Sequence, residues 1–167
     1  MRARKYHAYP DGSCSTDSHG QPALGWGVAL IAEDENGDFY FCGWMAASMA
    51  QDSALCGLNG NLDSNTAEML AMCWTLLWAI SSGRTFDLHI HTDSMFALGV
   101  AQLGQSLASN CILARCLAGL ATAAGEKRTV AMSHVHGHDW QPWNELADGL
   151  AKFAATTSRT FLDRDLA

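Results

Sequence analysis

Hydrophobic and polar positions along this chain follow two periods, which predict strands in some stretches and helices in others. Alternation with a period of two, together with short apolar runs, predicts strands at residues 5–11, 26–33, 38–45, 85–92 and 129–136. Apolar residues at helical spacing predict helices at residues 65–81, 94–103, 109–124 and 142–157. This order is typical of an α/β domain with a mixed sheet, in which an antiparallel hairpin comes first and parallel crossovers follow.

Local signals support several of these boundaries. Asn36-Gly37 predicts the tip of the first hairpin. Asn65, with Glu68 three residues later, matches a helix N-cap and its capping box, so we expect the central helix to begin there. Residues 51–64 are rich in Gly, Asn, Ser and Asp and predict a loop longer than compact domains usually contain.

The composition is that of one folded domain. Of the 167 residues, 49% are hydrophobic and 16% charged, so the chain can bury a core and is not disordered. We predict a single domain over residues 1–167, with its core at about residues 5–155, and a monomer. No apolar run reaches the ~18 residues of a membrane span. The basic N-terminus leads into no apolar signal segment, so no membrane partner is expected.

The cysteines and the charges argue against several kinds of site. The six cysteines form no Cys-x-x-Cys pair, which argues against a zinc ribbon or a thioredoxin-like site. We expect reduced thiols and an intracellular protein, in the cytoplasm or the nucleus. Ten Lys and Arg against 17 Asp and Glu give a net charge of −7, which argues against binding nucleic acid through a basic surface of its own.

Four carboxylates lie at the ends of predicted elements. Asp11 closes the first strand and Asp93 follows the fourth, while Glu68 and Asp148 lie on helices. Because the carboxyl ends of parallel strands share one edge of a sheet, Asp11 and Asp93 would lie side by side if their strands are parallel neighbours. Mg²⁺ is the hard cation that such oxygen ligands favour, and two ions about 4 Å apart suit phosphodiester displacement.

Each of these residues also has a structural interpretation. Glu68 fits the capping box, Asp11-Gly12-Ser13 fits an ordinary turn, and Asp148 fits a solvated helix face. Taken singly, each residue favours that interpretation, because structural ion networks also gather charge. The four together, at element ends, favour a site.

Histidines suggest a second kind of site. His134, His136 and His138 alternate as in a transition-metal site, but Gly137 breaks the strand pattern and no cysteine accompanies them. His89 and His91 are expected to be ordinary strand residues.

Four short motifs occur in order along the chain. They are Asp11-Gly12-Ser13-Cys14, Asn65-Thr66-Ala67-Glu68, Thr92-Asp93-Ser94, and Gly137-His138-Asp139 followed by Asn144-Glu145-Leu146-Ala147-Asp148. Together they resemble type 1 ribonuclease H, including the ribonuclease H domains of retroelement polyproteins. The resemblance covers about residues 5–155 and implies the ribonuclease H-like fold, a five-stranded mixed sheet flanked by helices.

The resemblance also implies an activity, hydrolysis of the RNA strand of RNA/DNA hybrids with two Mg²⁺ ions, or with Mn²⁺. It implies the metal ligands Asp11, Glu68, Asp93 and Asp148. It implies His138 as a further catalytic residue that aids proton transfer or product release. The implied substrate contacts are Gly12, Ser13, Cys14, Asn65 and Asn144.

Two positions depart from the family pattern: Pro10 precedes Asp11, and Met95 stands where some members have a polar residue. The chain also lacks the basic protrusion of many cellular members. We therefore expect hybrid affinity to come from a partner, such as a reverse transcriptase or another hybrid-binding domain in the same polypeptide. Two alternatives stay open, a catalytically weak module that binds hybrids or other nucleic acids, and another nuclease on the same fold.

Overall fold

Ten elements make up the part of the chain that the computed structural model describes, residues 4–16, 20, 22–50, 62–103, 112–136, 141–157 and 160–162. The strands are β1 (Lys5–Thr16), β2 (Pro22–Glu33), β3 (Phe39–Ala50), β4 (Asp87–Thr92), β5 (Val130–His134) and β6 (Thr160–Leu162). The helices are α1 (Ser64–Ser81), α2 (Met95–Leu103), α3 (Ile112–Lys127) and α4 (Pro142–Thr157).

The strands form one mixed sheet in the order β5-β4-β1-β2-β3-β6. β1, β2 and β3 are antiparallel neighbours, whereas β4 pairs in parallel with both β1 and β5. The predicted fold class, a five-stranded mixed sheet flanked by helices, is confirmed. β6 adds a short sixth strand beside β3 that the sequence did not predict, because three residues are too few to show a period.

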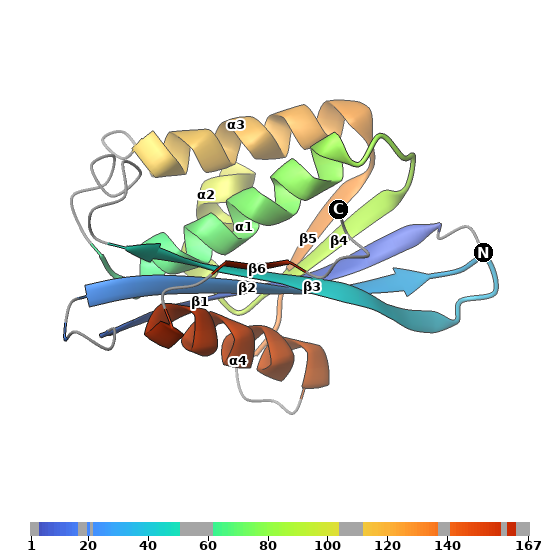
Figure 1. Cartoon of the computed structure of the whole chain (residues 1–167). Coiled ribbons are helices and arrows are strands. Elements are labelled where there is room, and N and C mark those ends of the chain that lie inside the picture. The colour runs from blue at the N-terminus through green and yellow to red at the C-terminus, as the bar shows by residue number, and fades with distance from the viewer. Residues whose placement is uncertain are drawn as a thin grey trace.

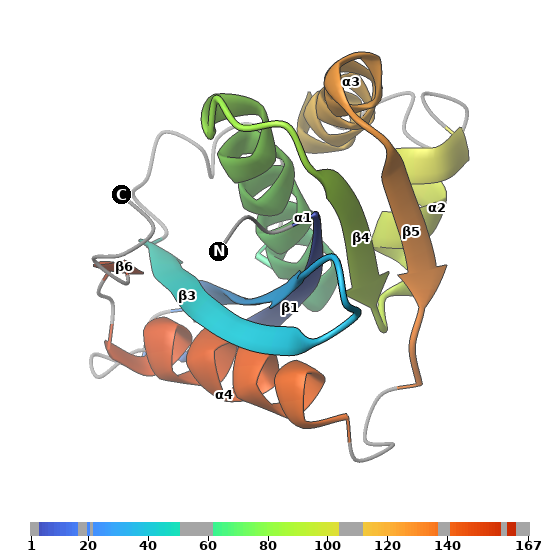
Figure 2. The same ribbon diagram turned by 90° about the vertical axis from the view of Figure 1, so that its right-hand side faces the viewer.

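Helices cover both faces of the sheet. α1, α2 and α3 pack together over one face, and α4 lies against the other (Figure 1). α4 packs mainly on β1, β2 and β3, and β4 and β5 continue beyond it (Figure 2). Residues 23–32 of β2 are buried without interruption, since this strand is covered on both faces.

The contact between α4 and the sheet is close because both surfaces are made of small residues. A Cβ built on Gly25 would lie 2.0 Å from the carbonyl oxygen of Ala151, and one on Gly27 would lie 2.5 Å from that of Ala147. Ala147 and Ala151 are themselves fully buried. The helix that carries Asp148 is thereby held directly against the strand next to β1.

β1 differs from its prediction in a way that affects the site. It does not end at Asp11 but runs on to Thr16, because its antiparallel ladder with β2 continues to the pair Thr16 and Pro22. The predicted turn at Asp11-Gly12-Ser13 is therefore wrong. Pairing with β4 stops at Ala8, two residues before Pro10, which has no amide hydrogen to donate. Asp11 thus lies beyond the end of the parallel pair, as the argument from shared strand ends requires.

The start of α1 also differs. Asp63 is the N-cap, and its Oδ1 accepts a hydrogen bond from the backbone N–H of Thr66 at 2.8 Å. The predicted N-cap at Asn65 is wrong, since Asn65 already lies within the first turn of the helix. Of the predicted loop, residues 51–61 lie outside the described residues.

The helices and the cysteines can also be compared with the expectations from the sequence. None of the helices in the described ranges is long and apolar enough to cross a bilayer. Free thiols are present at Cys14, Cys42, Cys73 and Cys116, while Cys56 and Cys111 lie outside those ranges.

Candidate active site

Asp11 lies at the centre of a cluster of carboxylates. Its side chain is buried, and burial is the largest cause that raises its pKa to about 8. Repulsion from Asp93, Asp148 and Glu68 raises the pKa further, while the N–H of Gly12, 2.6 Å from Oδ1, lowers it. The structure therefore places Asp93, Asp148 and Glu68 near enough to Asp11 to act on its charge.

Glu68 reaches the cluster because α1 lies directly on β1 at Gly12. A Cβ on Gly12 would lie 2.2 Å from the backbone nitrogen of Glu68, so only glycine permits this approach. With Asp63 as N-cap, a capping-box partner would be Thr66, and the interpretation of Glu68 as a capping residue is wrong. The Glu68 carboxylate accepts a hydrogen bond from the Ser94 hydroxyl. Burial raises the pKa of Glu68, and this hydrogen bond opposes the rise.

Asp93 is held by two hydrogen bonds, just after β4. Asn144 Nδ2 donates to its carboxylate Oδ2 at 3.4 Å, and His134 Nε2 donates to its backbone carbonyl at 3.2 Å. The next residue, Ser94, accepts a hydrogen bond from the N–H of Ala97 at 3.1 Å and so caps α2. Neither His134 nor Ser94 was predicted to belong to the carboxylate site. Ser94 had a signal in the Thr92-Asp93-Ser94 motif, whereas His134 was considered only for the alternative transition-metal site.

Asn144, which was predicted to contact substrate, is buried in the structure. It is 3% exposed, and its Oδ1 has no hydrogen-bond partner in the described ranges. An amide oxygen buried without a partner costs free energy unless a further ligand completes the site. Asn144 therefore positions Asp93 and leaves one oxygen available beside the carboxylates.

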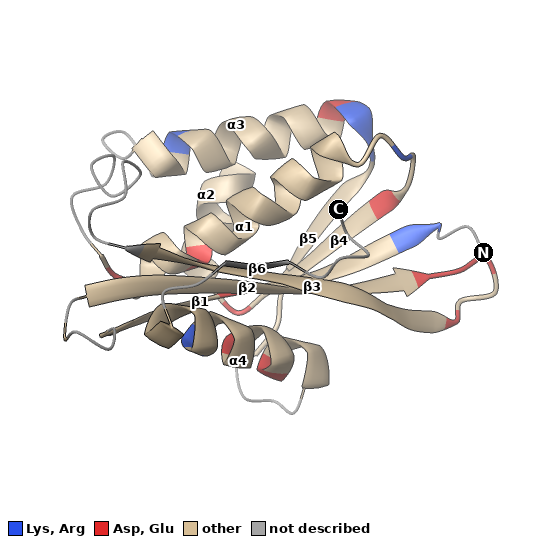
Figure 3. Ribbon diagram, viewed as in Figure 1, with Lys and Arg blue, Asp and Glu red and all other residues tan. Residues whose placement is uncertain are grey.

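Positive charge at the cluster comes from Lys152, which lies one helical turn after Asp148. Its Nζ is 2.6 Å from Asp148 Oδ2, and this hydrogen bond is the largest cause of the raised pKa of Lys152. The other described Lys and Arg residues lie at the ends of α3, at the start of β1 and before β4 (Figure 3). One exposed lysine beside four carboxylates leaves the cluster strongly negative.

The predicted substrate contacts border this cluster. Gly12 and Ser13 are half-buried in β1, and exposed Asn65 lies one helical turn before the Glu68 backbone that Gly12 touches. The thiol of Cys14 is exposed and donates to the carbonyl of Leu62 at 3.3 Å. The segments of the first two motifs, which are predicted to contact substrate, are thus neighbours in space.

Two predictions fall outside the described residues. His138, predicted to be catalytic, lies in the segment 137–140, which the structure does not describe. The alternative metal site at His134, His136 and His138 is untested for the same reason. Within the described ranges, His134 and His136 place their rings edge to face at 5.3 Å.

Solved structures share this fold. LC9 ribonuclease H1, a type 1 enzyme with the type 2 active-site motif, has a TM-score of 0.68 at 20% identity and covers 99% of this chain and 80% of its own. The ribonuclease H domain of prototype foamy virus has a TM-score of 0.66 at 16% identity, with coverages of 93% and 96%. LC11 ribonuclease H1 in complex with an RNA/DNA hybrid has a TM-score of 0.59 at 20% identity, with coverages of 90% and 96%. Because the sequence identities are this low, the structural similarity establishes the fold alone.

The family follows from the sequence itself. No curated protein sequence matches the chain significantly. The sequence model of the ribonuclease H family, however, matches residues 3–156, nearly the whole chain. With the strand order, the covering helices and the carboxylate cluster in place, this match shows that the protein belongs to the ribonuclease H family.

Proposed function

We propose that this ribonuclease H hydrolyses the RNA strand of RNA/DNA hybrids, with Mg²⁺ or Mn²⁺ held by Asp11, Glu68, Asp93 and Asp148. The observation that carries the proposal is the burial of Asp11 among three other carboxylates, which raises its pKa to about 8. A cluster of this kind is unfavourable by itself, so a bound cation explains why a fold would retain it. That LC11 ribonuclease H1 was solved with a hybrid supports the choice of substrate.

The donor atoms fit a hard divalent cation. Four carboxylates and the Oδ1 of Asn144, which has no partner among the described residues, offer only oxygen. Mg²⁺ and Mn²⁺ prefer this ligand over nitrogen or sulfur. When bound, a pair of such ions would supply the charge that activates water and stabilises the leaving oxygen. Asp11, Asp93, Glu68 and Asp148 would hold them.

The remaining residues of the site position these ligands and read the substrate. Asn144 and His134 fix Asp93, and Ser94 fixes Glu68. The exposed Asn65 and Cys14 offer short polar groups to a minor groove, where the 2′-hydroxyl distinguishes RNA from DNA. His138 is assigned proton transfer or product release, a role that suits a histidine near neutral pH.

The substrate class is tested by cleavage of end-labelled RNA/DNA hybrid, duplex DNA, duplex RNA and single strands in the presence of Mg²⁺. We expect cleavage of the RNA strand of the hybrid alone. Asp93→Asn is the matched control, because it removes one ligand charge and keeps a side chain that can pair with Asn144. Equal cleavage of duplex RNA, or an undiminished rate with Asp93→Asn, would contradict the proposal.

We further propose that a second domain of a longer polypeptide, such as a reverse transcriptase, supplies most of the hybrid affinity. The described basic side chains are scattered, and the net charge is −7 (Figure 3). Phosphate contacts by Lys and Arg provide most of the non-specific affinity for nucleic acid, and the described residues offer no basic patch for them. Ribonuclease H domains joined to a reverse transcriptase occur among the similar structures, in the foamy virus protein.

The affinity of the chain alone tests this second proposal. We expect a Kd for hybrid weaker than about 10⁻⁶ M at physiological salt, in the range of non-specific binding. Fluorescence anisotropy with labelled hybrid measures it, using Asp93→Asn to prevent cleavage. Nanomolar binding by the chain alone would overturn the need for a partner domain.

A further inference from the structure

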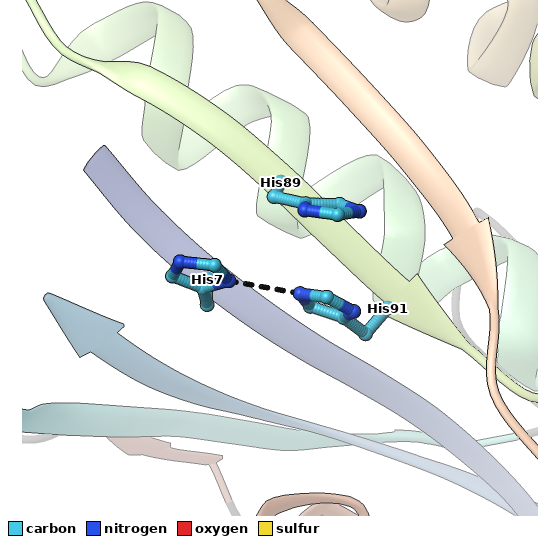
Figure 4. Close-up of side chains that lie close together, drawn as sticks. All are labelled: His7, His89 and His91. Carbon is cyan, nitrogen blue, oxygen red and sulfur yellow. Dashed lines mark hydrogen bonds between the residues drawn. The ribbon is translucent and has the colours of Figure 1, made fainter. Parts of the chain in front are cut away.

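We propose that His7, His89 and His91 form a binding site for a transition-metal ion of the Zn²⁺ class, separate from the four carboxylates. The proposal does not depend on the ribonuclease activity. Each imidazole offers one ligand nitrogen, and the three ligand atoms all lie within 4.8 Å of one another. Figure 4 shows the rings gathered beside β1 and β4.

The register of the sheet creates this cluster. His7 on β1 is paired directly with His89 on the parallel strand β4. Side chains alternate between the two faces of a strand, so His91 lies on the same face as His89. Even-numbered neighbours such as Leu88 and Ile90 are buried in the core, which leaves the histidines on the opposite face. That part of the sheet lies beyond α4 (Figure 2).

Each ring has one nitrogen that a metal could bind once the contact between His7 and His91 opens. His7 Nδ1 lies 2.9 Å from His91 Nε2, so these two nitrogens already face one another (Figure 4). In this hydrogen bond one nitrogen carries the proton and the other accepts it with its lone pair. A metal would replace the bond, and the donor ring would then carry its proton on its other nitrogen. Nε2 of His89 is engaged by the hydroxyl of Ser133 at 2.9 Å, which leaves its Nδ1 for a metal.

The other nitrogen of each ring is held by an oxygen, as is usual for histidines that bind metals. His7 Nε2 donates to Glu33 Oε2 at 2.9 Å. Ser133 Oγ lies 2.9 Å from His89 Nε2 and 3.2 Å from His91 Nδ1, so it serves both rings. These partners come from β2 and β5, so four neighbouring strands contribute to the site.

The ligand type separates this site from the carboxylate cluster. Three imidazoles favour Zn²⁺ and related transition metals, whereas an all-oxygen site favours Mg²⁺ and Mn²⁺. Zn–N bonds of about 2.0–2.1 Å in a tetrahedron place ligand nitrogens roughly 3.3 Å apart. The ligand nitrogens of the cluster all lie within 4.8 Å of one another, and metal binding would turn the rings so that their lone pairs converge on the ion. His89 and His91 are half-buried, so solvent and an ion can reach them.

The experiment is Zn²⁺ uptake by the metal-free full chain, measured by equilibrium dialysis and metal analysis in excess Mg²⁺. We expect one Zn²⁺ per chain, and visible absorption typical of tetrahedral Co²⁺ when Co²⁺ replaces it. His89→Gln should weaken Zn²⁺ binding at least about 100-fold, and Ser133→Ala about 10–100-fold. Both side chains are partly exposed, so these variants should fold, which circular dichroism checks.

Two variants serve as controls. His136→Gln removes an exposed histidine outside the cluster, and Asp93→Asn removes a carboxylate ligand. Neither should change Zn²⁺ uptake. The proposal is overturned if the wild-type chain takes up no Zn²⁺, if folded His89→Gln binds it as tightly as the wild type, or if Asp93→Asn loses it.

Discussion

Replacing Asp11 with Asn is expected to abolish hybrid cleavage and also to make the metal-free protein more stable. Cleavage should fall because the variant loses the buried ligand at the centre of the cluster. Bound cations contribute several kcal/mol of charge stabilisation, so the loss in rate should be at least about 10³-fold. Stability should rise because Asn keeps the shape of Asp but buries no charge, and it removes the repulsion with Asp93, Asp148 and Glu68.

The pH dependence of this gain follows from the raised pKa. Below pH 3.8, its ordinary pKa, Asp11 is protonated in both the folded and the unfolded chain, so its ionisation does not change the free energy of unfolding. Between there and about pH 8, the unfolded chain releases the proton and the folded chain retains it, so the folded state progressively loses stability. The advantage of Asp11→Asn should therefore be absent near pH 4 and largest at about pH 8.

Chemical denaturation in EDTA measures this difference. A tenfold change in acidity corresponds to about 1.4 kcal/mol, and the pKa of Asp11 rises from 3.8 to about 8, so we expect a gain of up to about 6 kcal/mol at about pH 8. Excess Mg²⁺ should reduce or reverse the gain, because only the wild type binds the ion fully. A variant no more stable than the wild type at about pH 8 would show that Asp11 is not destabilised by its surroundings.

Replacing Gly12 with Ala is expected to damage both the fold and the site. The new Cβ would lie 2.2 Å from the Glu68 nitrogen and 2.3 Å from the Ala67 carbonyl carbon, and both are backbone atoms that cannot turn aside. α1 must move away from β1, at a cost of about 1–3 kcal/mol or more. That movement carries Glu68 away from Asp11, and a displacement of about 1 Å at a catalytic site costs roughly 10²-fold in rate.

Gly119→Ala is the matched control for this prediction. Gly119 lies in α3, and nothing lies within 4 Å of a Cβ built on it. Alanine is favoured over glycine within a helix by about 0.5–1 kcal/mol, so this variant should be slightly more stable and fully active. Thermal unfolding and hybrid cleavage of the two variants side by side provide the measurement. Equal stability and activity of both would contradict the close packing at Gly12.

The sequence predicted those site residues that belong to short local motifs. The four carboxylates were found from their order along the chain and their places at element ends, and the resemblance to type 1 ribonuclease H is confirmed. The roles assigned to those carboxylates, to His138 and to the substrate contacts stay predictions.

Errors arose where tertiary contacts override local preference. Asp11-Gly12-Ser13 has the composition of a turn, yet pairing with β2 keeps it extended and packing against α1 requires its glycine. Asn65 and Asp63 are both good N-caps, and the sequence alone did not distinguish them.

The histidine cluster was not predictable at all. His7 and His91 are 84 residues apart, and only the parallel register of β1 and β4 brings them into contact. The hydrogen bond from His134 to Asp93 likewise depends on the pairing of β4 with β5.

The most direct test of the central claim, a divalent-ion site at the four carboxylates, is the rate of hybrid cleavage by the wild-type chain as Mg²⁺ is titrated after EDTA treatment. We predict no cleavage in EDTA and a rate that rises with Mg²⁺ to a plateau. The same curve for Asp93→Asn should stay at zero throughout. Cleavage that persists in EDTA, or that Asp93→Asn retains, would contradict the claim.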